Sequence, residues 1–354
     1  MRIELKQVLF PQPKSKIKAG DGKAEGRYKF FTSSPLQTKF HDEANYDEPS
    51  LIFGTGGNAS VHFCDEPFST STDCLVMYGR SRTELETIYN YLKSNIGILE
   101  NGFKGAGLKH ISKDYILAIE IDLPCETIQL EFLQKTRIID EVIESKRTQL
   151  LLNEDLVKSR FIEMFGDPKT NPLKWDMVTI GDIATDVRYG TSRPATEDGK
   201  YPYLRMNNLT YEGHLDLTDL KYIDIPDSEI EKCVVRYGDV LFNRTNSVEL
   251  VGKTCVYNLD YDTIIAGYII RVRIDDRILP VVLSNYLNSK VLKEQLRSMA
   301  KGAVNQANIN AQELRSIPIY LPPIDLQREF VAFVEQTDKS KYHGEFTYEM
   351  EVAA

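Results

Sequence analysis

The chain has 354 residues, of which 42% are hydrophobic, which is enough for two ordinary cores and too much chain for one. Its formal net charge of -9 counts against a protein that coats DNA nonspecifically through basic charge. The five cysteines lack metal-ligand spacing and no apolar run approaches the roughly 20 residues of a membrane span, so we expect no zinc site, disulfide framework or signal peptide, and a cytoplasmic location.

The first forty residues are basic despite the acidic total, because nine lysines and arginines stand there against three acidic residues. Lys14, Lys16 and Lys18 alternate along an extended stretch after Pro13. This spacing suits an arm that lies along a phosphate backbone, and a merely solvated basic run explains it nearly as well. We keep these lysines as candidates for DNA contact.

The region that follows has strand-like segments at 50–53, 60–63 and 74–78, then a helix over 82–95. Its polar loop residues are further candidates for DNA contact: Thr32, Ser33, Ser34, Gln37, Lys39, Thr55 and Asn58. The glycines at 54, 56 and 57 resemble a dinucleotide-binding turn, but that turn needs a following helix, and here a strand pattern follows. We expect these glycines to let the backbone approach phosphate closely.

The longest uninterrupted helix is predicted over 126–165, with Pro124 before its first turn and Gly166 after its last. It would be roughly 60 Å long, longer than a domain of about 130 residues is wide. Its apolar residues recur every seven positions, which indicates a partner helix rather than packing on its own globule alone. The residues expected between the two helices are Ile139, Ile143, Leu150, Val157, Phe161, Met164, Phe330 and Phe333.

Residues 173–321 again alternate short strands and turns, with strands at 201–204, 234–235, 240–242, 254–257 and 269–274 and one helix around 280–299. Three loops carry side chains suited to base edges: Arg188, Tyr189, Thr191, Ser192 and Arg193; Arg205, Asn207 and Asn208; Asn243, Arg244, Thr245 and Asn246. Such a cluster after a strand is an ordinary turn about half of the time. Arg244, flanked by asparagines, is the strongest single candidate.

The chain contains an internal repeat. Residues 121–129 and 319–327 share Leu-Pro and a later glutamine at an offset of 198, and each is followed by phenylalanine. Lys104 precedes the first copy, and Lys301 with Gln306 precedes the second, where these side chains either face DNA or cap a helix. We expect two copies of one unit, with a second helix that is short, ends near 343 and leaves a tail over 344–354.

We find no catalytic constellation and no metal site in the sequence. The Asn/Asp-Pro-Pro-Tyr/Phe motif of amino-methyltransferases does not occur. Asp227 with Glu229 and Lys232 imitates a nuclease metal site, but the acidic residues lie too close together, and the segment is typical of a short helix that begins at Asp227.

The two β-rich regions, each followed by a Leu-Pro-x-x-x-x-Gln helix start, resemble the specificity (S) subunit of type I restriction-modification systems. The motifs that carry this resemblance are residues 321–327, the helix end at 161–168 and Leu173-Lys174-Trp175, and the match covers nearly the whole chain. It implies an α+β fold: two β-rich α/β target-recognition domains in tandem repeat, joined by a long central helix that packs against a shorter C-terminal helix. The implied boundaries are 1–124 and 169–322 for the recognition domains and 125–168 and 323–343 for the spacer helices.

The same resemblance implies a non-catalytic protein that reads a bipartite double-stranded DNA target, one half per domain, with the helices as a spacer. Its implied partners are methyltransferase subunits, two of them, and a motor-nuclease subunit. S-adenosylmethionine, ATP and magnesium are expected on those partners and no cofactor on this chain. Two alternatives stay open: the recognition portion of a fused methyltransferase-nuclease, and a two-globule scaffold that binds protein.

Overall fold

Helix α4 (Glu126–Phe165) begins and ends where the sequence predicts. Gly166 ends it with a φ of 82°, a left-handed conformation that glycine adopts readily, and its N–H still donates to the Ile162 carbonyl. Trp175 Nε1 donates to the Phe165 carbonyl oxygen at 3.0 Å, and Tyr320 Oη donates to the Gly166 carbonyl oxygen at 3.0 Å. The last carbonyls of the helix, which have no partner within it, are therefore satisfied from later in the chain.

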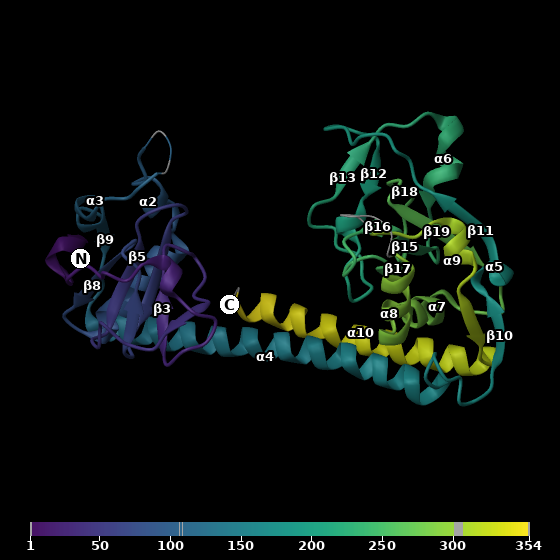
Figure 1. Cartoon of the computed structure of the whole chain (residues 1–354), viewed down its shortest axis with the longest axis horizontal. Coiled ribbons are helices and arrows are strands. Elements are labelled where there is room, and N and C mark those ends of the chain that lie inside the picture. The colour runs from purple at the N-terminus through teal and green to yellow at the C-terminus, as the bar shows by residue number, and fades with distance from the viewer. Residues whose placement is uncertain (1, 106, 108, 301–306, 353–354) are drawn as a thin grey trace. The chain divides into compact units, whose positions relative to one another are not determined.

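The computed structural model describes residues 2–105, 107, 109–300 and 307–352. The chain divides within α4 into unit 1, Met1–Ser145, and unit 2, Lys146–Ala354. Each unit closes around its own apolar cores and combines sheets with helices (Figure 1). The prediction of an α+β chain with two tandem domains is confirmed.

Unit 1 is built from a terminal strand pair and two sheets. The pair is β1 (Arg2–Glu4) with β9 (Glu120–Asp122), antiparallel. The first sheet, all antiparallel, has the order β2 (Leu9–Pro11), β8 (Cys74–Gly79), β5 (Ser50–Gly54), β6 (Ser60–Cys64). The second has the order β4 (Lys39–His41), β3 (Tyr28–Phe31), β7 (Phe68–Thr70), and its β3–β7 pair is parallel.

The helices of unit 1 are short apart from α4. They are α1 (Arg82–Ser94), α2 (Gly97–Glu100), α3 (Lys113–Leu117) and the 3-10 turns η1 (Leu5–Gln7) and η2 (Ala19–Asp21). Ser81 caps α1 by accepting from the Glu84 N–H, and the buried face of α1, with Leu85, Ile88 and Leu92, joins the core over the first sheet.

Unit 2 repeats this plan. Its terminal pair is β10 (Asp176–Thr179) with β21 (Pro318–Leu321). Its antiparallel sheet has the order β11 (Ala184–Tyr189), β19 (Ile269–Ile274), β15 (Val240–Asn243), β17 (Thr254–Val256). Its second sheet has the order β13 (Lys221–Ile223), β12 (Tyr201–Leu204), β18 (Thr263–Ile265), β14 (Val234–Val235), with β12 and β18 parallel; β16 (Thr245–Asn246) pairs with β20 (Ala307–Asn308).

Two helices stand where one was expected around 280–299. They are α7 (Pro280–Asn288) and α8 (Lys290–Met299). Ser289 separates them because its backbone is extended, with ψ of 149°, and its hydroxyl accepts the Leu292 N–H as the cap of α8. The remaining helices of unit 2 are α5 (Ile180–Ile183), α6 (Asp227–Cys233), α9 (Ala311–Arg315), α10 (Ile324–Val352) and the 3-10 turn η3 (Met206–Asn208).

The last helix is shorter than α4, as predicted, but it extends beyond the predicted end near 343. Helix α10 does not end near 343 but continues through Gly344 to Val352, so residues 344–352 are not a tail. No proline follows Pro323, and a single glycine costs a helix only about 1 kcal/mol relative to alanine. The helix is still shorter than α4, with 29 residues against 40.

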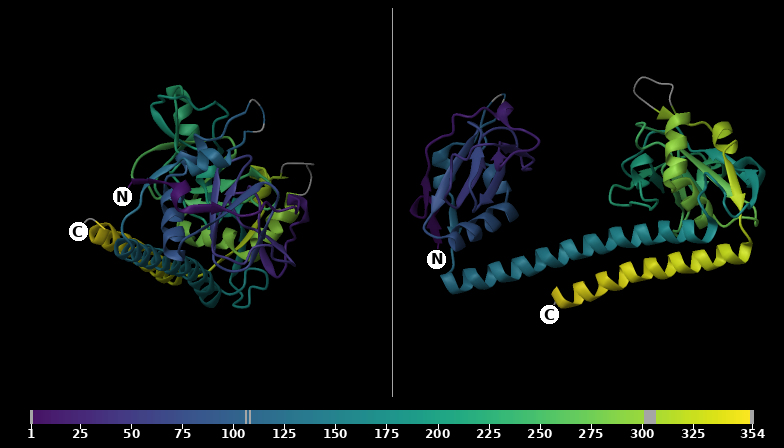
Figure 2. Two further views of the ribbon diagram at one scale, coloured as in Figure 1. Left: turned by 90° about the vertical axis from the view of Figure 1, so that its left-hand side faces the viewer. Right: turned by 60° about the horizontal axis from the view of Figure 1, so that its bottom comes forward.

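Within unit 2, α10 runs antiparallel beside the end of α4 (Figures 1 and 2). Phe330 packs edge-on against Phe161 and Phe165, with ring centroids 5.4 and 5.3 Å apart, and all three rings are buried. Met164 is buried and Val157 half-buried in the same core, while the Phe333 ring lies 5.8 Å from the Arg160 guanidinium.

The residues of the predicted stripe that precede Val157 do not belong to the described core of unit 2. Ile139, Ile143 and Leu150 are 44%, 39% and 44% exposed. The described side chains of α10 that enter the core, such as Phe330, meet the last turns of α4, so the stripe joins the core of unit 2 only from Val157 onward.

Candidate nucleic-acid interface

The three polar loops predicted in unit 2 converge on one cleft of about 530 Å³. The 190–195 loop, the η3 turn, Arg244 and the turn between β18 and β19 form its walls. The predicted residues that line it are Thr191, Ser192, Arg193, Arg205, Asn207 and Arg244. Residues that lie more than 50 positions apart in the sequence therefore share one surface.

The approach of Gly190 to the turn after β18 requires a glycine. A Cβ added at Gly190 would lie 2.0 Å from the Ile265 carbonyl oxygen and 2.4 Å from that of Ala266. Because backbone atoms cannot yield as a flexible side chain can, no larger residue fits here, and the 190–195 loop is held against this wall of the cleft.

Three arginines face the cleft, and two of them are neutralised. Arg193 Nη2 lies 2.7 Å from Glu229 Oε1, and Arg205 Nη2 lies 2.6 Å from Asp219 Oδ2. The hydrogen bond from Arg193 lowers the pKa of the Glu229 carboxyl. Both pairs keep their carboxylates ionised beside the guanidinium, which reduces the positive charge that these two side chains present.

Arg244 is held differently. Its guanidinium carbon lies 4.9 Å from the centroid of the Tyr189 ring, and its Nη1 donates to the Gly267 carbonyl oxygen at 3.2 Å. Among the described residues no carboxylate pairs with it, and its Nε is buried without an acceptor. Stacking on an aromatic face fixes the plane of a guanidinium while leaving N–H groups at its edge.

Five other predicted contact residues of unit 2 do not line the cleft. Asn208 is 1% exposed, and its Oδ1 accepts the Arg205 N–H at 2.8 Å as the cap of η3. Asn243 is fully buried in β15, and Thr245 is buried with its hydroxyl donating to Asn308 Oδ1. Arg188 pairs with Asp186 on β11 outside the cleft. Asn246 is half-buried next to Asn243.

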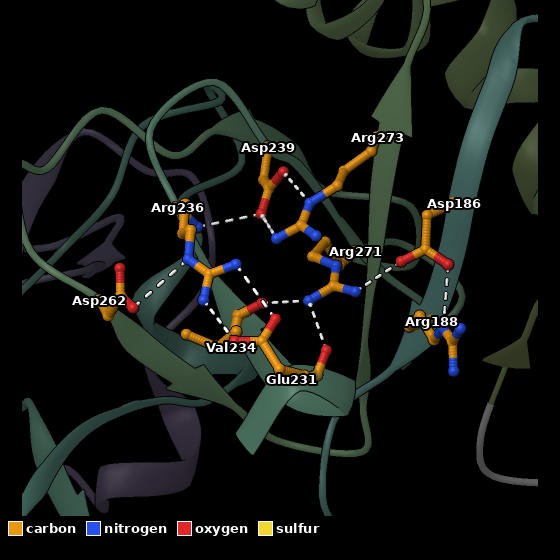
Figure 3. Close-up of polar contacts among 9 residues, drawn as sticks. All are labelled: Asp186, Arg188, Glu231, Val234, Arg236, Asp239, Asp262, Arg271 and Arg273. Carbon is orange, nitrogen blue, oxygen red and sulfur yellow. Dashed lines mark hydrogen bonds and ion pairs between the residues drawn. The ribbon is translucent and has the colours of Figure 1, made fainter. Parts of the chain in front are cut away.

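An ion-pair network ties the two four-stranded sheets of unit 2 together (Figure 3). Arg271, 1% exposed, donates through Nη2 to Asp186 Oδ2 at 2.5 Å and through Nη1 to the Val234 carbonyl oxygen. Arg273 reaches Asp239 at 2.8 Å. Burial raises the pKa of the Asp186 carboxyl, but hydrogen bonds from Arg188 and Arg271 outweigh that effect, so the pKa is lowered overall.

The main chain around Thr55 in unit 1 follows the same pattern as that around Arg244. The Arg244 carbonyl oxygen accepts the Ile309 N–H at 2.9 Å, and the Thr55 carbonyl oxygen accepts the Ile111 N–H at 3.1 Å. Ile111 and Ile309 keep the 198-residue offset of the repeat. Thr55 in unit 1 therefore corresponds to Arg244 in unit 2.

The basic arm of unit 1 corresponds to the 190–195 loop of unit 2. The Thr72 N–H donates to the Ile17 carbonyl oxygen at 2.8 Å, just as the Gly267 N–H donates to that of Thr191 at 2.7 Å. Along the arm Ser15 is buried, with its hydroxyl bonded to the Thr70 carbonyl at 2.6 Å, and Ile17 is half-buried. The alternating residues Lys14, Lys16 and Lys18 are exposed, as an extended arm requires.

Ser33 joins the two predicted loops of unit 1. Its hydroxyl donates to the Asp73 carbonyl oxygen at 2.7 Å and accepts the N–H groups of Thr55 at 3.2 Å and Gly56 at 3.3 Å. A single side chain thus holds the turn after β3 against the turn after β5.

The other candidates of unit 1 lie around this junction with varying exposure. Ser34 accepts at its carbonyl oxygen from His62 Nε2 at 2.9 Å, and Gln37 donates to the Lys39 carbonyl at 2.5 Å. Lys39 donates to the Ala19 carbonyl at 3.0 Å. Asn58 and Lys104 are exposed and Thr32 half-exposed, whereas Lys301 and Gln306 lie outside the described residues.

The cleft of unit 2 also contains residues that sequence reasoning missed. Tyr268 is 49% exposed in its wall, Tyr203 is buried below it, and Gly267 supplies the carbonyl that holds Arg244. An exposed tyrosine directly after an Ala-Gly turn between two apolar strands was the available signal.

None of the described helices combines the length and apolar composition that a membrane span requires. In the same described ranges, no group of three or more His, Cys, Asp or Glu side chains gathers closely enough to hold a metal ion.

Relatives of the chain are similar to parts of it. A putative type I restriction enzyme MjaX specificity subunit of Methanocaldococcus jannaschii is 29% identical over 171 residues, 47% of this chain and 40% of that protein. The type I restriction enzyme EcoKI specificity subunit of Escherichia coli K12 is 30% identical over 158 residues, 44% of this chain and 34% of that protein. These matches thus span less than half of the relatives' lengths.

The fold is also that of a solved protein. A crystal structure of a type I restriction-modification system S subunit from M. genitalium matches with a TM-score of 0.59 at 16% identity, covering 100% of this chain and 93% of that one. The family model for the type I restriction modification DNA specificity domain matches residues 3–153 and 172–344, one match for each copy of the repeat. Since these matches take in most of both units, the chain belongs to the type I restriction modification DNA specificity domain family.

Proposed function

We propose that this chain reads double-stranded DNA as the specificity subunit of a type I restriction-modification complex, with each unit contacting one half of a bipartite target. The observation that carries the proposal is that the two units share the same main-chain hydrogen bonds. In unit 1 these bonds hold the basic arm and the turn at Thr55, and in unit 2 they hold the 190–195 loop and the turn at Arg244. Two domains of the same fold with different side chains on their loops can contact two half-sites of different base sequence.

The side chains at these positions suit two kinds of DNA contact, one to phosphates and one to base edges. Exposed Lys14, Lys16 and Lys18 fit phosphate oxygens, for which only local charge matters, so the net charge of -9 does not oppose contact. Exposed Asn207 and Ser192 at the cleft of unit 2 fit base edges, which are read by amide, hydroxyl and guanidinium groups.

The rest of the complex supplies the chemistry. Methyltransferase subunits, two of them, and a motor-nuclease subunit are the proposed partners, and S-adenosylmethionine, ATP and magnesium bind to them. The exposed apolar residues of α4, among them Leu151 at 64% and Leu152 at 63%, support a protein partner along this helix. We further propose that the length of the continuous helix α4 determines the unread spacer between half-sites.

The test is adenine methylation in the host. Single-molecule methylome sequencing is carried out on the host strain with its gene intact and deleted. We expect one split adenine-methylated motif to disappear on deletion and to return with a plasmid copy. An unchanged methylome would overturn the proposal.

Two further outcomes separate the alternatives. Methylation by the purified chain alone with S-adenosylmethionine would favour a fused enzyme, of which this chain is the recognition portion. A chain that neither alters the methylome nor shifts random duplex DNA at low salt, yet co-purifies with other proteins, would be a protein-binding scaffold.

A further inference from the structure

Arg244 differs from the other two arginines of its cleft in having no carboxylate partner among the described residues. The guanidinium groups of Arg193 and Arg205 form ion pairs with Glu229 and Asp219, at 2.7 and 2.6 Å. Arg244 instead donates one N–H to the Gly267 carbonyl oxygen, and it lines the cleft as a half-buried residue whose Nε has no acceptor. A partly desolvated cation without a counter-charge is unfavourable, and a ligand with acceptor atoms relieves that.

Hydrogen bonds hold the main chain of Arg244 on both sides. Arg244 N–H donates to the Tyr268 carbonyl oxygen at 2.9 Å, and its own carbonyl accepts from Ile309 at 2.9 Å. Its neighbours Asn243 and Thr245 are 0% and 6% exposed. With the Tyr189 ring under the guanidinium, both ends of the side chain are held before any ligand arrives, which reduces the entropy lost on binding.

The geometry favours a base over a phosphate. A guanidinium whose plane is fixed presents two parallel N–H groups, which match the O6 and N7 acceptors of guanine in the major groove. A general phosphate contact would be needed in both copies of the repeat, but the matching position in unit 1 is Thr55, which has no positive charge and cannot form two parallel bonds.

We propose that Arg244 determines the specificity of unit 2 by reading one guanine of its half-site. The inference rests on the function proposed above. At the equivalent position of unit 1, the Thr55 hydroxyl already donates to the Asp73 carbonyl oxygen at 2.9 Å. Tyr189 and Gly267 act as positioning residues for the guanidinium.

The experiment replaces the gene in its host by Arg244→Lys or Arg244→Ala and sequences the methylome. Lysine keeps the positive charge but loses the paired N–H groups. We expect one guanine of the unit 2 half-site to become degenerate in both variants, with about a 10- to 100-fold loss of preference for guanine, while the unit 1 half-site stays unchanged. The matched control is Arg277→Lys, which makes the same chemical change in a guanidinium paired with Asp275 outside the cleft.

Two results would overturn the inference while leaving the proposed function intact. One is a methylated motif that is identical in wild type and both variants. The other is a uniform fall in methylation at all sites without a change of motif, as a phosphate contact or a packing role would give. Fluorescence of Trp175, the one tryptophan of the chain, checks that unit 2 of each variant unfolds at the wild-type denaturant concentration. Absence of any motif in the wild-type host would contradict the proposed function itself.

Discussion

Gln129 and Gln327 make the same hydrogen bond in the two copies of the repeat: each Nε2 donates at 2.8 Å to the carbonyl oxygen of the proline five residues earlier. This bond explains why Leu-Pro is followed by glutamine at that spacing, because the side chain folds back over the first turn of the helix and satisfies a carbonyl that the proline turn leaves free. Gln327 does more, since it also donates to the Arg277 carbonyl at 3.0 Å and accepts the Leu279 N–H at 2.8 Å.

Gln327→Ala should therefore destabilise its unit more than Gln129→Ala. The first substitution removes the side-chain partner of three main-chain groups, one in a buried and two in part-buried hydrogen bonds, and we expect a loss of about 3 kcal/mol in the free energy of unfolding of unit 2. The second breaks one bond, with an expected loss of about 1 kcal/mol in unit 1. Native-state hydrogen exchange of strands β19 and β5 measures the two units separately, and equal losses would contradict the argument.

Arg271→Met should unfold unit 2 far more easily than Arg236→Met. Arg271 is buried and donates to Asp186 and to the Val234 carbonyl oxygen. Its removal takes this donor from Val234 and leaves Asp186 with Arg188 alone, at a cost of about 3 kcal/mol. Arg236 has a side chain that is 42% exposed and pairs with Glu231 at the surface, where a pair contributes about 1 kcal/mol or less. The urea dependence of Trp175 fluorescence gives both values. A similar shift of the two midpoints would show that the buried network is not what holds these sheets.

Lys293 should make the stability of unit 2 depend on pH. Burial, with help from the nearby Arg297 charge, lowers its pKa from 10.5 to about 7. Between those two values the unfolded chain binds the proton and the folded chain does not, so the free energy of unfolding rises with pH in this window, by at most about 1.4 kcal/mol per unit, and that stability is lost as pH falls toward 7.

The comparison is made with Lys293→Met, in which this rise should be absent. Lys290→Met, at an exposed lysine of the same helix, should keep the wild-type slope. Urea unfolding at several pH values from 7 to 9.5 reports the slope through Trp175. If Lys293→Met and wild type run parallel, Lys293 is not the group that titrates.

The lysines of the arm should govern how salt weakens DNA binding. If Lys16 contacts a phosphate, Lys16→Ala lowers the slope of log affinity against log salt concentration by about 0.9, and equally for every duplex sequence. Lys113→Ala, at an exposed lysine in α3 far along the chain from the arm, serves as the control and should leave the slope unchanged. Titrations of the assembled complex at 50–200 mM salt measure it, and a change in sequence preference without a change of slope would contradict a phosphate role.

Several local features of this protein could be predicted from its sequence. The bounds of α4 follow from Pro124 and Gly166, central strands such as β5, β8, β15 and β19 from short apolar segments between turns, and the duplication from residues 121–129 and 319–327. Each of these signals acts within a few residues, through φ preferences, capping or periodicity, and so survives without knowledge of the fold. The break at Ser289 and the extension of α10 were missed because one serine and one glycine each allow either outcome.

Tertiary structure decided which polar loop residues are available for recognition. Asn208 and Asn243 look the same in sequence as exposed Asn207, yet both are buried, and Arg193 and Arg205 find their carboxylates 36 and 14 residues away. Burial and ion pairing depend on which distant segments the sheets bring together, and no local pattern carries that information. The sequence alone therefore specified two similar domains and a long helix. The packing of β15, β18 and η3 left Arg244 as the arginine of the cleft without a carboxylate among the described residues, because there the fold provides an aromatic face and a carbonyl in place of an acid.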